Sequence, residues 1–566
     1  MPETKTMVDP PLLRRLLPII YEDDDLMAVA KPAGLDAGRL PKSDTDGVAE
    51  IVAALRGLHT PWEPANRLSR YESGILLLGK NTAIVRHIRH GLRTLRIEQE
   101  YVAVVLGKMS QPHVSIGPQH GRSRGRGRKK AGHAPTRAAA TAAIQVIPDT
   151  TLTPLYTGPK RTLVRCRTNV ETTHSLRAQL RSLRLRALGD VIQNQTGRPI
   201  SHDMTCLHLA RIAFHHPGAG RKLHLNCRPP ESFQAIADGA RDASRPLHAA
   251  LVRRLPLLVD PTVNASRLLT GDFEDVPGLV AERYGQVVIM QLLQERQALT
   301  DALPDIARWY RDTLHVQAVY LKRSIRRGKD GTGPTIHREP ADLATAELLY
   351  GKPVPDEIEI HEGDLRFTVR PRDPLSVGLF LDHRDNRRRV RELAVGKDVL
   401  NLFAYTCGFS LAAALGGATS TVSVDLSPKH LDWGRANFAL NGVKENGHHF
   451  VQADAFQFLE RAQQNGQTFD LVILDPPSFA HGRKRGQDFS VARDLPALVR
   501  ASLAVLRPEC VMIVSTNLRR MPLSALKECV KRGAGRRRAR ALDAPSLPVD
   551  FAVDPDHAKT VFVQVE

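Results

Sequence analysis

The segment that most suggests chemistry is residues 475–479 (DPPSF), which follow an apolar run at 469–474 that is typical of a buried strand. Two prolines stiffen the turn and remove backbone donors, so the Asp475 carboxylate and the Pro476 carbonyl form a rim of acceptors. An exocyclic amine of a base can donate to both, which orients its lone pair toward a methyl donor, and Phe479 can stack on that base. A purely structural turn would explain the prolines alone, so we favour a catalytic role.

A second candidate site is the turn between the apolar run at 398–403 and a helix-like run that follows it, a turn that contains Gly408. A small residue between strand and helix lets the backbone approach a ligand closely. The next strand, at 420–424, is followed by Asp425, which is placed to accept hydrogen bonds from a cofactor ribose. The alternative is that Asp425 and Ser427 cap the helix that comes next.

The chain has 566 residues, too many for one compact core, and three zones can be distinguished. Residues 373–566 alternate apolar strands with helical stretches, which predicts a parallel α/β sheet. Residues 250–372 combine short strands with a helix expected at 298–313, as in a small α+β domain. Residues 1–240 suggest a third, mixed α+β domain, with a basic insertion at about 111–135.

Several stretches of the second half carry a family resemblance: 271–284 (GDFEDVPGLVAERY), 378–384 (GLFLDHR), 401–409 (NLFAYTCGF), and 475–479 together with 515–517 (STN). Through them, residues 265–566 resemble the class I methyltransferases related to the bacterial 23S ribosomal RNA large-subunit methyltransferases. The resemblance implies an α/β fold with a Rossmann-like, doubly wound sheet, S-adenosylmethionine as the cofactor and RNA as the substrate.

The same resemblance implies roles for single residues. Asp425 would hold the cofactor ribose and Asp454 the adenine amine, while Asp382 and Arg384 would close over the methionine part. The cofactor-binding residues that the matching stretches imply are Phe380, Asp382, Arg384, Asn401, Phe403, Tyr405, Thr406, Gly408, Asp425, Asp454 and Asp475.

The positions of the cysteines limit which base the protein could modify. The 5-methylcytosine branch of the family needs a cysteine nucleophile, but Ser478 stands after the prolines and residues 515–517 lack cysteine. Cys407 lies in the cofactor turn, and we expect Cys510 to be buried. The chain therefore resembles the guanine-methylating branch, whose target nitrogen, exocyclic or in the ring, needs only orientation and proximity. The catalytic residues would be Asp475, Pro476 and Phe479.

The N-terminal zone carries a second resemblance. The segments that carry it are 29–35 (VAKPAGL), 66–77 (NRLSRYESGILL), 173–177 (THSLR), 188–190 (LGD), 207–210 (LHLA) and 214–217 (FHHP). These are similar to motifs of the RluA-type pseudouridine synthases, so residues 1–240 are expected to share that fold.

One departure from that family affects its chemistry. The catalytic aspartate of the family is Ser69 here, and Asn66 replaces the usual histidine. A serine hydroxyl lacks the charge and basicity of a carboxylate at neutral pH, and we expect Glu72 to face a different direction. The zone is therefore interpreted as a degenerate synthase that keeps an RNA-binding groove. Its RNA contacts would be Arg67, Arg70, His174 and Arg177, although solvated arginines and a structural histidine would look the same.

Composition agrees with an RNA partner. Lys and Arg total 80 against 60 for Asp and Glu, a net charge of +20, which favours contact with phosphates. Residues 121–130 alone carry six positive charges, in either a solvated loop or an RNA contact. Six scattered cysteines without a C-x-x-C pair indicate neither a metal site nor disulfides and fit a reduced cytoplasm. No signal peptide or membrane span is expected.

Together these features predict an S-adenosylmethionine-dependent RNA methyltransferase that acts on a guanine in 23S rRNA, free or in a pre-ribosomal subunit. The sequence leaves three alternatives open. They are a bifunctional enzyme with surviving synthase activity, a non-catalytic RNA-binding protein of ribosome assembly, and a methyltransferase for small molecules or proteins. Ser69 argues against the first, the intact pocket motifs against the second and the basic charge against the third. No oligomeric state is predicted.

Overall fold

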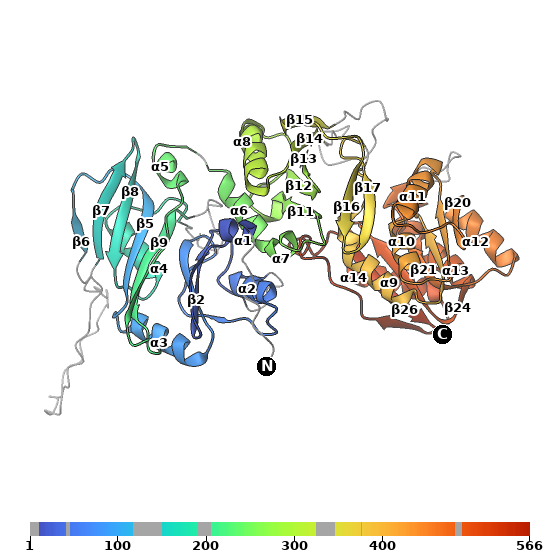
Figure 1. Ribbon diagram of the computed structural model, residues 1–566, viewed down its shortest axis with the longest axis horizontal. Coiled ribbons are helices and arrows are strands. Elements are labelled where there is room, and N and C mark those ends of the chain that lie inside the picture. The colour runs from blue at the N-terminus through green and yellow to red at the C-terminus, as the bar shows by residue number, and fades with distance from the viewer. Residues whose placement is uncertain are drawn as a thin grey trace, which may run out of the picture. The chain divides into compact units, whose positions relative to one another are not determined.

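The computed structural model describes residues 11–40, 46–116, 150–190, 205–240, 242–323, 346–374, 376–480 and 489–566 (Figure 1). The basic stretch 121–130 lies outside these ranges. The chain divides into two compact units, Met1–Pro256 and Leu257–Glu566. No helix of the described ranges has the length and apolar character needed to cross a membrane.

In its described ranges, the first unit folds around one ten-stranded sheet with the order β1-β2-β4-β9-β5-β8-β7-β6, in which β3 pairs with β4 and β10 with β9. The strands are β1 (Ile19–Glu22), β2 (Leu26–Lys31), β3 (Glu63–Pro64), β4 (Ser73–Gly79), β5 (Glu98–Leu106), β6 (Val114–Ile116), β7 (Thr150–Thr157), β8 (Arg161–Thr168), β9 (Leu207–His215) and β10 (Lys222–Asn226). The helices are α1 (Pro11–Leu16), α2 (Val48–Arg56), α3 (Thr82–Arg93), α4 (Thr173–Ser182), α5 (Ser232–Ala237) and α6 (Ser244–Arg253), and α7 (Leu255–Leu258) follows at the boundary between the units.

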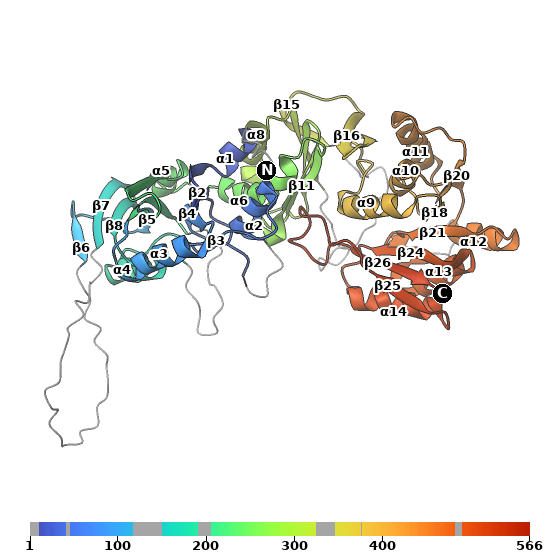
Figure 2. The ribbon, with the colours of Figure 1, turned by 60° about the horizontal axis from the view of Figure 1, so that its bottom comes forward.

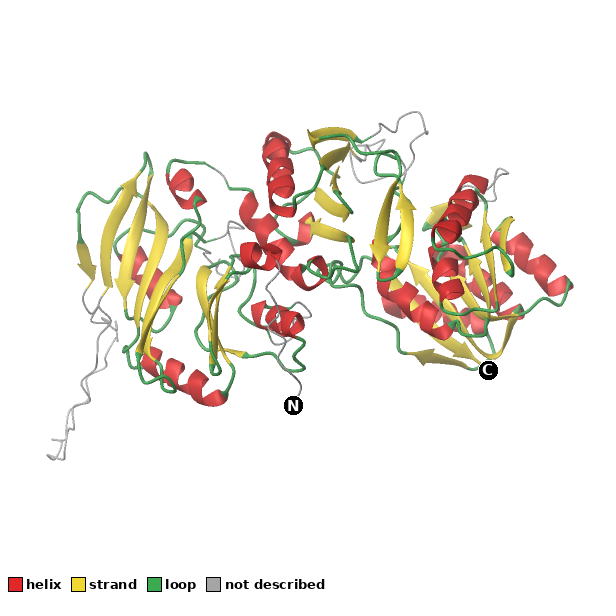
Figure 3. Cartoon of the chain, viewed as in Figure 1, coloured by secondary structure: helices red, strands yellow, loops and turns green. Residues whose placement is uncertain are grey.

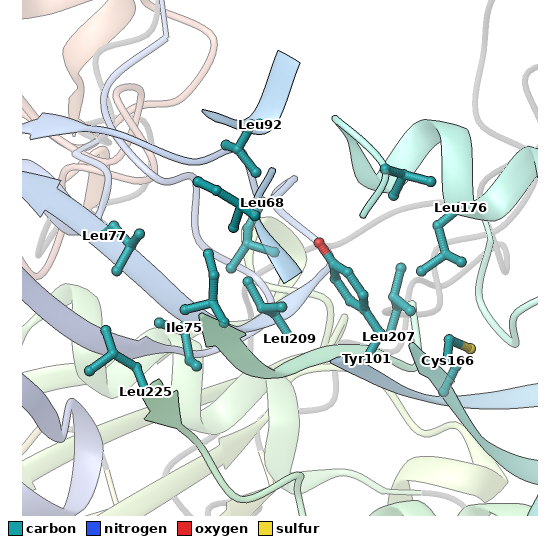
Figure 4. Close-up of a cluster of buried hydrophobic side chains, with 14 of the residues drawn as sticks. Leu68, Ile75, Leu77, Leu92, Tyr101, Cys166, Leu176, Leu207, Leu209 and Leu225 are labelled. Carbon is teal, nitrogen blue, oxygen red and sulfur yellow. The ribbon is translucent and has the colours of Figure 1, made fainter. Parts of the chain in front are cut away.

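The core of this sheet lies on both of its faces. On β5, Tyr101 joins the large apolar cluster that includes Leu92 of α3 and Leu176 of α4 (Figure 4). The neighbouring Val102 joins a second cluster with Phe233 of α5. Side chains alternate between the faces of a strand, so a strand covered on both sides needs a continuous apolar run, which β5 has. The mixed α+β class predicted for this unit is confirmed (Figure 3).

The second unit begins with a five-stranded sheet of order β11-β12-β13-β14-β15, here called the central sheet. Its strands are β11 (Ala265–Thr270), β12 (Leu279–Tyr284), β13 (Val287–Leu292), β14 (Ala318–Arg323) and β15 (Glu347–Gly351). Helix α8 (Gln297–Leu314), which was expected at 298–313, joins the parallel strands β13 and β14, and β12 and β13 form an antiparallel pair before it. A hairpin of β16 (Ile358–Glu362) and β17 (Leu365–Val369) follows.

The rest of the unit is built on a seven-stranded sheet of order β20-β19-β18-β21-β24-β26-β25. Its strands are β18 (Asp398–Leu402), β19 (Ser420–Asp425), β20 (His448–Gln452), β21 (Phe469–Leu474), β24 (Leu506–Thr516), β25 (Ala539–Leu542) and β26 (Lys559–Val565), and its helices are α9 (Arg384–Leu393), α10 (Gly408–Leu415), α11 (Pro428–Leu440), α12 (Ala455–Gln464), α13 (Val491–Ala504) and α14 (Leu523–Ala534). Strands β18 to β21 and β24 run parallel, whereas β26 is antiparallel to both of its neighbours, β24 and β25.

Helices cover both faces of this sheet, as the doubly wound prediction requires (Figure 2). On β21, Leu471 and Ile473 pack in a cluster with Val390 of α9. Val472 and Leu474, which point to the opposite face, pack with α12, α13 and α14. Strands β18 and β21 are neighbours within the sheet. From β18 the chain builds the sheet outward through β19 and β20, and it then returns to β21 and builds outward in the opposite direction, so the strand order reverses between β18 and β21. A crevice for a ligand forms at the carboxyl ends of the strands at such a reversal.

Candidate active site

Three of the predicted carboxylates lie at this one edge of the seven-stranded sheet. Asp425 ends β19, Asp454 stands two residues after β20, and Asp475 follows β21 directly. All three strands run parallel with β18, so their carboxyl ends meet on the same side. The topology therefore brings together residues that stand far apart in the sequence.

The turn from β18 to α10 holds an unusual backbone. Phe403, Tyr405 and Cys407 have φ angles of 59°, 48° and 62°, in the left-handed region that non-glycine residues rarely adopt. Two hydrogen bonds support the turn, from the Ala404 N–H to the Val424 carbonyl at 3.0 Å and from the Tyr405 N–H to Asp425 Oδ2 at 2.9 Å. Strain of this kind gathers at ligand-binding sites.

Three predicted cofactor residues in this turn or in the elements beside it lie in ordinary packing. Asn401 is buried and donates to Ser410 Oγ at 2.9 Å, so it joins β18 to α10. Thr406 is also buried and donates to the Gly378 carbonyl at 2.6 Å. Gly408 begins α10, and a Cβ added there would meet its neighbours at ordinary contact distances of 3.5 Å or more. These residues position the turn, and a direct cofactor contact by any of them stays a prediction.

Gly378 holds the segment 378–384 close to α11. Its φ is +107°, and a Cβ there would lie 2.2 Å from Cζ2 of Trp433. Trp433 is itself fixed by donating to the Thr368 carbonyl at 2.9 Å. Only glycine tolerates both the positive φ angle and the close approach to Trp433. This close approach brings the segment 378–384 against the turn that carries Tyr405.

Asp425 and Asp454 accept hydrogen bonds from different backbone groups. Asp425 accepts the N–H groups of Tyr405 and Ser427, each at 2.9 Å. Burial by itself raises the pKa of this carboxyl, but hydrogen bonds, the His430 contact first among them, outweigh it and lower the pKa. Ser427 caps α11, so the capping alternative holds for Ser427, and a ribose contact by Asp425 stays a prediction. Asp454 caps α12 with Oδ1 alone, and no partner of Oδ2 is found within the described ranges.

Aromatic side chains line the same edge. The Phe380 ring is 49% exposed and its centroid lies 5.3 Å from that of Tyr405, which in turn lies 4.6 Å from His430. Burial raises the pKa of Tyr405 to about 12, so the phenol stays neutral. Phe403 lies 5.8 Å from Phe489 on the other side of the turn. Exposed aromatic faces of this kind attract cationic ligands.

The DPPSF segment follows β21, and its role as an acceptor rim stays a prediction. Pro476 is buried, Asp475 is half-buried and the Phe479 side chain is 45% exposed. Ser478 donates to Asn517 Oδ1 at 2.7 Å, which ties the segment to the end of β24. Phe479 also begins β22 (Phe479–Ala480), which pairs with β23 (Phe489–Ser490).

An ion pair that the sequence reasoning missed anchors Asp475. His383, which is buried, places Nε2 3.1 Å from Asp475 Oδ2, and its Nδ1 lies 3.0 Å from the side-chain amide of Asn386. Burial lowers the pKa of His383, but the charges of Asp475 and Asp382 outweigh burial and the nearby Arg387, and they raise that pKa to about 9. His383 is therefore an imidazolium at neutral pH and orients the carboxylate.

This ion pair predicts a pH dependence of stability. The pKa of His383 rises from 6.5 to about 9 on folding, so its contribution is complete below about pH 6.5 and is lost as the pH rises through 9. We expect the free energy of unfolding of the second unit to fall by about 2–3 kcal/mol over that window. Chemical denaturation between pH 6 and 9.5 measures it. His383→Gln should flatten the profile, whereas His361→Gln, at a histidine whose side chain is 42% exposed, should not. Equal profiles for both variants would contradict the pairing.

No cysteine in the described part of the second unit is placed as a nucleophile. Cys407 is buried, and burial raises its pKa to about 12. The expectation that Cys510 is buried was wrong: it is half-buried, with Sγ 3.6 Å from Asp470. It lies near the start of β24, whereas residues 515–517 lie at the opposite end. This favours direct transfer over a covalent intermediate.

Arg384 is committed to contacts within the protein. It donates to both Asp550 oxygens at 2.8 and 3.3 Å and to the Ala265 carbonyl at 2.8 Å. It therefore ties β11 to the C-terminal loop, and closure over a cofactor stays a prediction. Asp382 is 8% exposed, and His557 Nε2 lies 3.7 Å from its Oδ2. Burial raises the pKa of Asp382, but the neighbouring His383 and His557 outweigh it and lower the pKa.

In the first unit, the synthase-like site contains a carboxylate after all. The expectation that Glu72 faces away was wrong: its Oε2 accepts the Ser69 N–H at 2.9 Å, and Oε1 lies 3.5 Å from Arg177 Nε. Arg177 also donates to Asp190 at 3.1 Å. Glu72 is completely buried, because the turn at 69–72 folds its side chain inward. Lys31 lies beside it, donates to the Glu72 carbonyl at 2.6 Å and has a pKa that burial lowers to about 7.

The other predicted RNA contacts differ in exposure. Arg67 and His174 are exposed, and Arg70 is half-buried. Asn66 is buried, donates to the Ile75 carbonyl and accepts the Leu77 N–H. The Asn66 side chain thus holds its segment to the backbone of β4, which is a structural role. The exposed Arg67 and His174 remain available to a partner.

Comparisons with known proteins agree with both resemblances. Residues 273–553 match the family model of the S-adenosylmethionine-dependent methyltransferases, and residues 25–182 match that of the RNA pseudouridylate synthases. The chain is 32% identical over 338 residues to the ribosomal RNA large subunit methyltransferase of Deinococcus radiodurans, which covers 56% of this chain and 78% of that protein.

Other relatives match over shorter stretches. Identity to the ribosomal RNA large subunit methyltransferase K of Neisseria meningitidis is 42% over 171 residues, which is 30% of this chain and 48% of that protein. Identity to methyltransferase K/L of Chromohalobacter salexigens is 38% over 266 residues, 44% of this chain and 35% of that protein. The chain thus spans less than half the length of these two relatives.

A solved structure also matches. It is assigned as a methyltransferase and contains SAH, and it superposes with a TM-score of 0.50 at 26% identity, covering 63% of this chain and 89% of its own. A methyltransferase-assigned structure from Streptococcus mutans gives the same values. The fold and the cofactor class of the second unit agree with these neighbours.

Proposed function

This chain belongs to the S-adenosylmethionine-dependent methyltransferases, and we propose that it methylates a base nitrogen in RNA, with a guanine of 23S ribosomal RNA as the favoured target. The observation that carries the proposal is the Asp475 carboxylate, held by His383 at the sheet edge that also bears Asp425. The ribosomal RNA methyltransferases among its relatives support RNA as the acceptor.

S-adenosylmethionine, when bound, supplies an electrophilic methyl group on a positively charged sulfur. The groups at the sheet edge suit such a cofactor. Asp425 can accept from ribose hydroxyls and Asp454 Oδ2 from the adenine amine, and α10 begins without a side-chain cap, which leaves N–H groups for a carboxylate. The rings of Phe380 and Tyr405 attract positive charge.

The DPPSF segment would orient the acceptor base. The Asp475 carboxylate and the Pro476 carbonyl accept from the base, and the imidazolium of His383 keeps the carboxylate in place. The exposed Phe479 ring offers a stacking surface. A nitrogen held in this way needs no covalent bond to the protein, and catalysis follows from proximity and orientation.

The first unit would act as an RNA-docking module. Its match to the RNA pseudouridylate synthases supports an RNA-binding surface, and the exposed Arg67 and His174 are candidate contacts, with the half-buried Arg70 beside them. Glu72 stands near the place of the lost aspartate, but it is completely buried and held by Ser69. We therefore propose that this unit binds RNA, or a pre-ribosomal subunit, without isomerising uridine.

The test is a methyl-transfer assay with the full-length protein. Purified protein is incubated with tritiated S-adenosylmethionine and undermodified ribosomal RNA, and the RNA is digested to nucleosides. We expect labelled guanosine and no new pseudouridine. Labelled cytidine would overturn the choice of base, new pseudouridine would show that the first unit is active, and absence of label despite cofactor binding would overturn the proposed function.

A further inference from the structure

Helix α3 of the first unit carries a row of arginines on its solvent face, here called the basic stripe. The residues that this helix buries against the core are Ile84, Val85, Ile88 and Leu92. The exposed Arg86, Arg89 and Arg93 follow one another at spacings of three and four residues. Residues at these spacings lie in one row along a helix, so the three guanidinium groups share the side opposite the core.

The charge of the basic stripe is not balanced within the helix. Residues 81–97 contain four arginines, at 86, 89, 93 and 96, and no aspartate or glutamate. Like charges three or four residues apart repel each other, so a helix face that meets only water commonly alternates acids with its arginines. The helix dipole stabilises a cation in the last turn, where Arg93 lies, but it does not account for Arg86, one turn after the helix begins.

Most of these arginines are not used by the protein itself. Within the described ranges, the side chains of Arg86, Arg93 and Arg96 make no hydrogen bond or ion pair, and all three are exposed. Arg89 differs, because its Nη1 lies 2.7 Å from Glu63 Oε1. A guanidinium keeps its charge at any physiological pH, so three full positive charges face outward from the end of α2's neighbouring helix, α3, without a counter-charge from the described residues.

The basic stripe adjoins the candidate RNA contacts of the first unit. Arg89 donates to the Pro64 carbonyl at 2.8 Å, at the end of β3, and Arg67 stands three residues later. Leu92 of α3 and Leu68, the neighbour of Arg67, belong to the same apolar cluster (Figure 4). The segments that carry the stripe and Arg67 are therefore bound to each other, and one polyanion can contact both.

The chemistry of the basic stripe fits a phosphate backbone. Guanidinium groups bind phosphate through forked pairs of N–H donors, and contacts of this kind position a nucleic acid without reading its sequence. A lipid surface does not fit, because an amphipathic helix binds a membrane through its apolar face, and Ile84, Ile88 and Leu92 are buried in the core. The match of this unit to the RNA pseudouridylate synthases agrees with RNA as the partner.

We propose that Arg86, Arg93 and Arg96 bind phosphates of the substrate RNA away from the methylated base, and that α3 is thus a docking surface. The inference rests on the proposed function and deepens it, because it assigns the RNA-docking role of the first unit to one helix face. Arg89 holds the stripe in place by tying α3 to β3. Such contacts form equally before and during methyl transfer, so they contribute to RNA affinity and KM and leave kcat unchanged.

The test measures filter binding of a radiolabelled 23S ribosomal RNA transcript to the full-length protein over a series of salt concentrations. Arg86→Gln/Arg93→Gln removes two charges at exposed positions and keeps good helix formers. We expect its affinity to fall about tenfold or more at about 0.1 M salt, and the slope of log affinity against log salt to become shallower by about 1.5. Cofactor affinity, and kcat at saturating transcript, should equal those of the wild type.

Two further variants are matched controls. Arg86→Lys/Arg93→Lys keeps both charges, and it should retain most of the affinity and the salt slope, because lysine binds phosphate as a point charge. Arg461→Gln/Arg500→Gln removes the same charge from exposed positions of α12 and α13, and its affinity and salt slope should stay close to those of the wild type.

The outcomes separate the inference from the proposed function. Wild-type affinity and salt slope in Arg86→Gln/Arg93→Gln would overturn the inference, and the proposed function would stand. An equal loss in Arg461→Gln/Arg500→Gln would also overturn it, because the effect would follow from net charge alone. Polyglutamate that displaced the transcript at equal charge concentration would overturn RNA as the partner and assign the stripe to an acidic protein. A wild type that binds the transcript through the stripe but does not methylate it would overturn the proposed function alone.

Discussion

Replacing Asp475 by alanine should lower kcat for RNA methylation by about 100- to 1000-fold. The carboxylate is the charged acceptor of the rim, and His383 holds it at 3.1 Å in one orientation. Without it, the base nitrogen loses its partner and the imidazolium of His383 loses its counter-charge. Single-turnover kinetics with undermodified ribosomal RNA would measure the chemical step directly.

The controls for this prediction separate charge from shape. Asp475→Asn keeps the acceptor oxygen but not the charge, so we expect a smaller loss than in the alanine variant. Asp432→Asn changes a 75%-exposed carboxylate on α11, and kcat should stay within a factor of about two of the wild type. If Asp475→Ala kept kcat within about threefold while the protein remained folded, Asp475 would not be catalytic.

Replacing Glu362 by alanine should lower the free energy of unfolding of the second unit by about 3–5 kcal/mol. Arg387 donates to both oxygens of Glu362, at 2.7 and 2.8 Å, and both side chains are buried. Removing the carboxylate leaves the Arg387 guanidinium buried without a counter-charge, which costs more than the contact itself contributes. Chemical denaturation monitored by circular dichroism would measure the change.

The effect should extend to the active site. Arg387 also donates to the Phe380 carbonyl at 2.9 Å, in the segment that carries Phe380, Asp382 and His383. The matched control is Glu357→Ala, which removes an exposed partner of Arg370 and should cost less than about 1 kcal/mol. Equal destabilisation by the two variants would show that the buried pair has no special role.

The sequence by itself determined the fold class and the sheet edge at which two of the candidate carboxylates lie. Apolar runs at 398–403 and 469–474 alternate with helical stretches, and this pattern allows little else than a parallel sheet covered on both faces. The carboxyl ends of such strands meet at one edge, so Asp425 and Asp475 could be placed together before the structure was known. The stiff turn of the DPPSF segment could also be predicted, because prolines restrict the backbone locally.

Only the tertiary structure decided which residues are held by others. His383 pairs with Asp475 and Arg384 with Asp550 across long stretches of chain, and no local pattern encodes such contacts. Glu72 folds back to Ser69, which spacing alone had placed apart. The turn at 403–407 takes left-handed backbone angles without glycine, because Asp425 and the neighbouring strand hold it. Local sequence fixes backbone preference and periodicity, whereas burial and pairing depend on which surfaces the fold brings into contact.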